Sequence, residues 1–357
     1  MHHFLRGRLL YVVLGCLAVL LFVWTRAVMR AVPADQSAVS PVVSAEPAAP
    51  VEPLHWIPKE LQWDELPRVL ADQPVLGAAL AVVLAGTLGF ALAGIGLTIW
   101  GIGTGRYRTM WQFPDPALPA WSFGELGRIL LLMVVVAMGL PVLAIAAASA
   151  GIDVVLTDPH VRLTVSMLVL DAAAILIIAA FAIGKRTSLW QTFGCARRRL
   201  WATLATSVRS YVTLFPWLFV VLWITVEVAR VVGIKPPVEP IQELIFQENR
   251  PAVLGLTALL ACLVGPAAEE LFFRGVVFSV LHRRLSRAAA IGLSAGAFAL
   301  LHGNLIGCPS IWLLGCLLAY LYERTGSLTG PLMIHVLHNT LLMSMALMIR
   351  RVMELAG

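Results

Sequence analysis

The sequence predicts an all-α fold, a polytopic bundle of about eight to nine transmembrane helices. Of its 357 residues, 59% are hydrophobic and only 13% are charged, and the mean hydropathy is +0.86. A helix needs about 20 mainly apolar residues to cross a bilayer. Residues 73–105 and 129–152 contain no charged residue and exceed that length. These observations exclude an ordinary soluble domain.

Composition divides the chain into four parts. Residues 1–30 hold an apolar stretch between arginines, which predicts an uncleaved signal anchor. Residues 31–74 are rich in alanine and proline, which indicates a tether ending in an interfacial segment. Residues 75–233 contain the N-terminal transmembrane helices, and residues 234–350 a second transmembrane domain. After the anchor, we expect spans near 75–101, 129–150, 163–184, 211–232, 253–281, 288–303, 310–322 and 331–349.

Basic residues predict the orientation of the bundle. They gather in three loops, near residues 106–108, 185–209 and 283–287. With a cytoplasmic N-terminus all three loops are cytoplasmic, as the positive-inside rule requires. Arg350 and Arg351 then lie outside, against this rule. We expect a multi-pass protein of the plasma membrane whose partner is the bilayer, and no nucleic-acid partner despite the net charge of +6.

Two adjacent acids interrupt an otherwise apolar span. Glu269 and Glu270 follow a stretch, from residue 251, without any ionisable group except Cys262. An intramembrane charge is costly and is by default a functional candidate. Arg274 lies four residues after Glu270 and shares its helical face, whereas Glu269 points about 100° away. Either Glu270 and Arg274 form a buried structural pair, or Arg274 holds Glu270 and leaves Glu269 free as a general base.

Pro266 precedes these acids and lacks an N–H, so it should free a carbonyl near Cys262 and admit water.

Three further polar residues lie in later apolar segments. His302 follows Phe298 by one helical turn and is either a core histidine or a catalyst. His335 and Asn339 share a helical face and would suit an oxyanion-stabilising pair or an inter-helix contact. Their neighbour His338 is more easily structural.

These motifs together resemble the CAAX-protease and bacteriocin-processing family of intramembrane proteases. The resemblance rests on Glu-Glu-x-x-x-Arg at 269–274, Phe-x-x-x-His at 298–302 and His-x-x-x-Asn at 335–339, in this order. It implies hydrolysis of a peptide bond in a membrane-associated or prenylated-type protein. It also implies that Glu269 and His302 activate water, that His335 and Asn339 stabilise the oxyanion, and that Glu270 and Arg274 order the site.

The resemblance leaves the metal and the substrate open. If zinc is present, Glu269, His302 and His335 are its expected ligands; there is no HExxH motif, and we favour a metal-free mechanism. The expected partner is a membrane protein or a lipidated peptide. The alternatives are a proton-coupled transporter and a non-catalytic membrane scaffold or immunity protein.

Overall fold

The structure is a computed structural model that describes residues 15, 66–113, 116, 118–149, 158–184, 193–194, 200–234 and 239–356. The expected anchor, apart from residue 15, and the tether up to residue 65 lie outside the described residues. The elements are α2 (Leu66–Asp72), α3 (Pro74–Gly103), η2 (Arg106–Thr109), α4 (Phe123–Ser149), α5 (Pro159–Gly184), α7 (Leu200–Val232), α8 (Pro240–Gln247), α9 (Pro251–Leu259), η4 (Leu260–Val264), α10 (Gly265–Glu269), η5 (Glu270–Phe278), α11 (Ser279–His282), α12 (Arg287–Leu301), α13 (Cys308–Thr325) and α14 (Thr329–Ala356).

The all-α polytopic prediction is confirmed. Within the described residues, six helices are long and apolar enough to cross a membrane, namely Pro74–Gly103, Phe123–Ile145, Pro159–Gly184, Leu200–Val232, Pro251–His282 and Thr329–Leu355. Two other expected spans correspond to α12, which is shorter, and to α13, which is not among the six. The side chains along α3 are mostly exposed and apolar, as expected of a helix that faces lipid.

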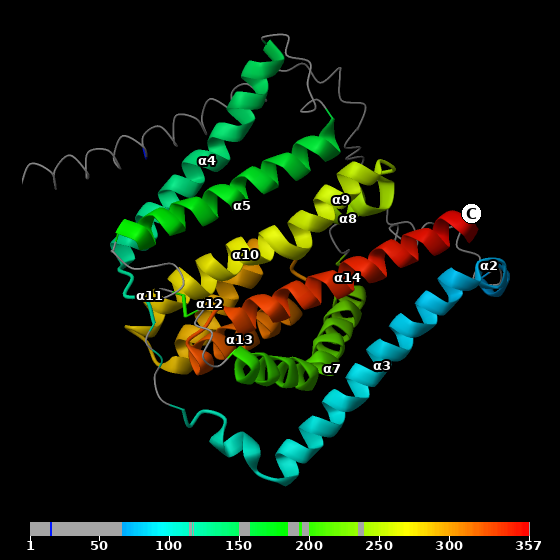
Figure 1. Cartoon of the computed structure of the whole chain (residues 1–357), viewed down its shortest axis with the longest axis horizontal. Coiled ribbons are helices and arrows are strands. Elements are labelled where there is room, and N and C mark those ends of the chain that lie inside the picture. Colours follow the sequence, from blue (N-terminus) through cyan, green and yellow to red (C-terminus); the bar gives the residue numbers. More distant parts are fainter. Residues whose placement is uncertain are drawn as a thin grey trace, which may run out of the picture.

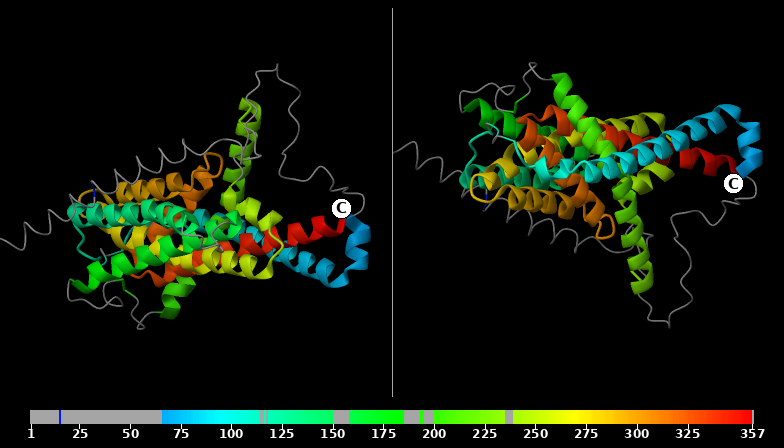
Figure 2. Two further views of the ribbon diagram at one scale, coloured as in Figure 1. Left: turned by 90° about the horizontal axis from the view of Figure 1, so that it is seen from above. Right: turned by 90° about the horizontal axis from the view of Figure 1, so that it is seen from below.

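The helices form a bundle around α13 (Figure 1). α4 and α5 pack together on one flank, and α3 lies on the other flank against α7. α13 packs against α12, α7 and α14, while α5 packs against the helix formed by α9 to α11. The further views show α7 crossing the other helices at a steep angle (Figure 2). Helices from the N-terminal half therefore flank the helices of residues 239–356.

Local sequence signals explain where several helices begin and end. Proline stands at the start of α3, α8 and α9, where its missing N–H costs nothing. The Ser286 hydroxyl accepts a hydrogen bond from the Ala289 N–H and caps α12. Gly326 ends α13 with a φ of 63°, a left-handed conformation that favours glycine.

Gly94 allows a close helix crossing. A Cβ atom at this position of α3 would lie 2.2 Å from the carbonyl oxygen of Val212 in α7. Only glycine permits this approach of two backbones, as small residues do at many membrane helix contacts.

Arg350 is held by backbone carbonyls near the end of α14. It is 8% exposed, and it donates to the carbonyls of Ile245, at 2.8 Å, and Glu248. It also bonds the Asn249 side chain at 2.8 Å. Arg350 therefore binds the end of α8 and the residues that follow it. A buried arginine of this kind says little about which side of the membrane its segment faces.

Candidate active site

The helix that carries the two glutamates departs from α-helical hydrogen bonding. The segments η4 and η5 are π-helical, and the Gly265 N–H donates to the Leu260 carbonyl five residues earlier. In the same register, the Ala261 carbonyl would receive its bond from residue 266, which is a proline without an N–H. The Asn339 side chain supplies the missing donor, with Nδ2 at 2.8 Å from the Ala261 oxygen. The free carbonyl expected near Cys262 is therefore that of Ala261, and it accepts a hydrogen bond from Asn339 of α14.

Glu270 lies at the centre of a buried polar cluster. Its side chain is 1% exposed, and Oε1 accepts from Arg274 Nη1 at 2.7 Å. The same oxygen lies 2.9 Å from His335 Nδ1. Arg274 is fully buried and also donates to the Gly315 carbonyl at 3.2 Å. The expected Glu270–Arg274 pair is present, and it joins η5 to α13 and α14.

This cluster also shows that His335 lies at the same level of the bundle as the two glutamates. Counted along the helices, His335 lies close to the start of its own span, and Glu269 and Glu270 lie far along theirs. The 2.9 Å contact between His335 and Glu270 shows that α14 brings the histidine to the level of the acids.

Glu269 has a different environment from its neighbour. Its side chain is 34% exposed, and Oε2 lies 3.6 Å from His335 Nε2. That distance is longer than a normal hydrogen bond. Within the described part of the chain, no hydrogen bond to the Glu269 carboxylate is seen. The Glu270 carboxylate is therefore fixed by several partners, while the Glu269 carboxylate is partly exposed.

Phe298 links the three sequence motifs. Its ring lies 4.5 Å from the Arg274 guanidinium carbon, 4.7 Å from the His302 ring and 5.7 Å from the His335 ring. It is 1% exposed. A cation above an aromatic face and imidazoles at its edge are favourable contacts. Phe298 therefore contacts a residue of each of the three motifs.

His302 lies at the open side of this cluster. It follows the last residue of α12 and is exposed. Its Nδ1 is 2.8 Å from the Phe298 carbonyl oxygen. A carbonyl only accepts, so Nδ1 carries the proton, and in the neutral ring Nε2 keeps a free lone pair. No hydrogen bond or ion pair joins His302 to Glu269 among the described residues; the two are connected through Phe298 and His335.

Asn339 and His338 contribute contacts between helices. Asn339 uses one N–H on Ala261, and a primary amide has a second. His338 Nδ1 lies 2.9 Å from the Tyr211 hydroxyl of α7, which agrees with the structural role expected of it.

Asp171 is a residue that sequence reasoning did not assign to the site. It lies on α5, which packs against α10, and its Oδ2 faces Gly265 at 3.5 Å from where a Cβ would be. It is close enough to Glu269 for the two charges to repel. An acid within an apolar span is rare, and this could have marked Asp171 as a candidate. Which helix Asp171 faces depends on how the helices pack, and the sequence does not show this.

The three side chains considered for zinc do not form a ligand set. No group of three His, Cys, Asp or Glu among the described residues is arranged to hold a metal ion. Both histidines use Nδ1 for a hydrogen bond, His335 with Glu270 and His302 with a carbonyl, and these contacts by themselves leave Nε2 able to bind a metal. Because the three side chains are not grouped around one point, the mechanism below includes no step through a metal.

The fold and site define a class, namely a helical membrane protein with an acid–histidine cluster inside its bundle. Residues 251–341 match the family described as "Type II CAAX prenyl endopeptidase Rce1-like", and all six expected site residues lie within them. "Putative membrane peptidase YdiL" of Bacillus subtilis (strain 168) is 29% identical over 106 residues, which is 28% of this chain and 43% of that protein. The match thus spans less than half of that relative. No solved structure matches the chain.

These two matches support the resemblance of residues 251–341 to the CAAX-protease and bacteriocin-processing family.

Proposed function

We propose that the chain is an intramembrane endopeptidase that hydrolyses a peptide bond of a membrane-associated or prenylated-type protein substrate. The observation that carries the proposal is the contrast between the two adjacent acids. Glu270 is 1% exposed and bonded, whereas Glu269 is 34% exposed beside the same histidine. Two carboxylates in such different environments suit two different tasks. The match of residues 251–341 to the family model supports the same reaction class.

In the proposed reaction, Glu269 and the free Nε2 of His302 together position a water and accept its proton. The water oxygen attacks the substrate carbonyl carbon, and the carbonyl becomes an oxyanion. The second N–H of Asn339 and a protonated His335 Nε2 donate to that oxyanion. The C–N bond then breaks, and the proton taken from water passes to the leaving amine.

Glu270 and Arg274 act on this reaction through His335. Glu270 accepts a hydrogen bond from His335 Nδ1, which fixes the orientation of the ring. Arg274 holds Glu270 in place through its ion pair with Oε1. Neither residue touches the substrate in this scheme.

The basic loops favour a plasma-membrane protein with a cytoplasmic N-terminus.

The test is proteolysis by the full chain in liposomes, with a quenched fluorescent peptide offered in farnesylated and unmodified forms. Glu269→Gln and His302→Ala should each lower the rate about a hundredfold or more. Glu227→Gln is the control, because Glu227 lies near the end of another candidate span and pairs with Arg230 rather than with a site residue. Undiminished cleavage by both site variants would refute the proposal.

Two further readouts separate the alternatives. Activity should survive a strong chelator; complete loss that zinc restores would overturn the metal-free scheme. Proton flux across the liposome without any cleavage would favour the transporter.

A further inference from the structure

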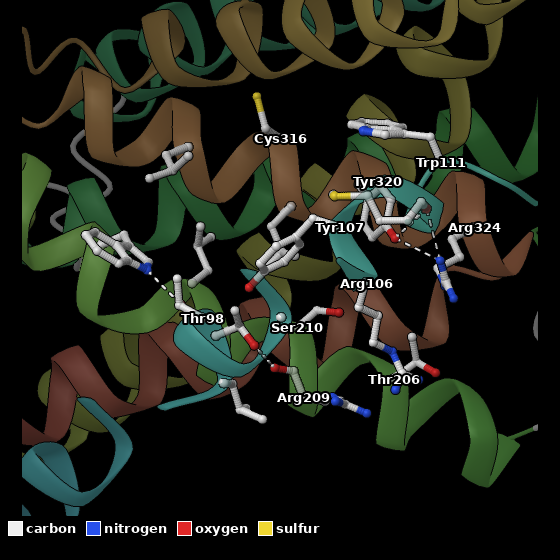
Figure 3. Close-up of a pocket in the computed structure, with 18 of the residues that line it drawn as sticks. Thr98, Arg106, Tyr107, Trp111, Thr206, Arg209, Ser210, Cys316, Tyr320 and Arg324 are labelled. Carbon is white, nitrogen blue, oxygen red and sulfur yellow. Dashed lines mark hydrogen bonds between the residues drawn. The ribbon is translucent and has the colours of Figure 1, made fainter. Parts of the chain in front are cut away.

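A cavity lies between helices of the N-terminal half and α13. It measures about 720 Å³ and is lined by α3, η2, α7, α12 and α13 and by the segment after η2 (Figure 3). This volume falls within the range of small-ligand pockets, roughly 300–1,000 Å³. None of the six proposed site residues lines it within the described part of the chain. Its lining therefore differs from the candidate active site, although Cys316 of the lining lies near Arg274.

One end of the cavity is strongly cationic. Arg106, Arg209 and Arg324 line it, and no Asp or Glu does so among the described residues. Arg106 and Arg209 both lie against Trp100, with guanidinium carbons 5.0 and 4.8 Å from its ring centre. Hydroxyl groups of Thr206 and Ser210 add neutral donors around them.

The other end of the cavity is apolar. Along α7, the lining changes from Arg209 to Trp217 over eight residues, about 12 Å of helix. Along α13 it changes from Arg324 back to Leu313 over eleven residues, about 17 Å. Leu97 continues the apolar wall on α3. A ligand that fills this space has an anionic head and an apolar tail.

We propose that this cavity binds one anionic phospholipid, with its phosphate among the three arginines and the start of an acyl chain along the apolar wall. Guanidinium groups bind phosphate through paired hydrogen bonds. Basic pockets between transmembrane helices recognise anionic headgroups for this reason. Free phosphate would use the arginines but leave the apolar wall uncovered. The proposal does not rest on peptidase activity, so either can fail without the other.

The test measures lipid retained by the full chain in neutral detergent, using native mass spectrometry. Phosphatidylglycerol should bind at one molecule per chain, and phosphatidylcholine far more weakly. The double variant Arg209→Gln with Arg324→Gln should weaken phosphatidylglycerol binding roughly tenfold or more. Arg108→Gln should leave it unchanged, because Arg108 is exposed on the same short helix as Arg106 and does not line the cavity.

A variant without a change of charge protects the test against misfolding. Leu317→Trp fills the apolar part of the cavity and should also weaken phosphatidylglycerol binding. Unchanged binding in both the arginine and the tryptophan variants would overturn the proposal. Inorganic phosphate that binds as tightly as the lipid would instead identify an anion site. A farnesylated peptide that binds here while phosphatidylglycerol does not would assign the cavity to the substrate.

Discussion

Replacing Arg274 with methionine tests the buried cluster most directly. The change removes a guanidinium 2.7 Å from Glu270 Oε1 and its contact with the Phe298 ring at 4.5 Å. Methionine keeps much of the volume, so the main effect is a carboxylate, 1% exposed, that loses its counter-ion. Breaking a buried ion pair from one side costs about 3–5 kcal/mol. We expect a loss of that size in the free energy of unfolding, measured in detergent micelles by denaturant titration.

A double-mutant cycle isolates the pair from other effects of methionine. Glu270→Gln alone leaves Arg274 buried without its carboxylate and should cost a similar ~3–5 kcal/mol. Independent effects would sum to ~6 kcal/mol or more. The double variant has no charge left to compensate, so we expect it to lose less than either single variant. Additive losses would refute the reasoning, since they would mean that the two side chains do not interact. All three variants should be inactive. The double variant should therefore be more stable than either single variant without being more active.

Three further predictions concern other parts of the bundle. Asp171→Asn should raise the free energy of unfolding by ~1–2 kcal/mol, because it removes an intramembrane charge. It should also lower turnover if the charge of Asp171 influences Glu269 during the reaction. A lower free energy of unfolding would contradict the first prediction. Gly94→Ala should destabilise by ~1–3 kcal/mol in thermal unfolding, whereas Gly96→Ala, which meets nothing within 4 Å, should not. The Arg250 side chain, by hydrogen bonding, holds the pKa of Glu248 well below its usual range. This pair therefore stabilises the folded state above the ordinary glutamate pKa and loses that effect on acidification. Wild type should lose more stability than Glu248→Gln between about pH 6 and pH 3, and equal losses would contradict it.

The sequence predicted those parts of the site that depend on helical spacing. Glu270 and Arg274 are four residues apart in one helix, and the pair forms although this segment is π-helical. The absence of an N–H at Pro266 predicted a freed carbonyl for the same local reason. The all-α fold and its spans followed from apolar run length, because a bilayer accepts few alternatives to helices.

Contacts between distant helices could not be predicted in this way. The donor that reaches Ala261 comes from Asn339, 78 residues later in the chain. Asp171 faces α10 only because α5 packs there. Arg350 was counted as a loop charge, yet it is a buried donor to carbonyls 102 and 105 residues away. In each case a short-range pattern identified an unusual residue, while its partner depended on how the bundle assembles.

Phe298 suggests why the three motifs must occur together. Arg274 lies over its ring, and both histidines pack against it. A cation beside Phe298 holds Glu270, Glu270 orients His335, and the same ring supports His302. Loss of any one motif would therefore alter the position of the others, and Glu269 would lose its partners without being changed itself. Leucine at position 298 should thus lower activity strongly although it leaves every polar residue in place, and normal activity would show that the ring only fills space.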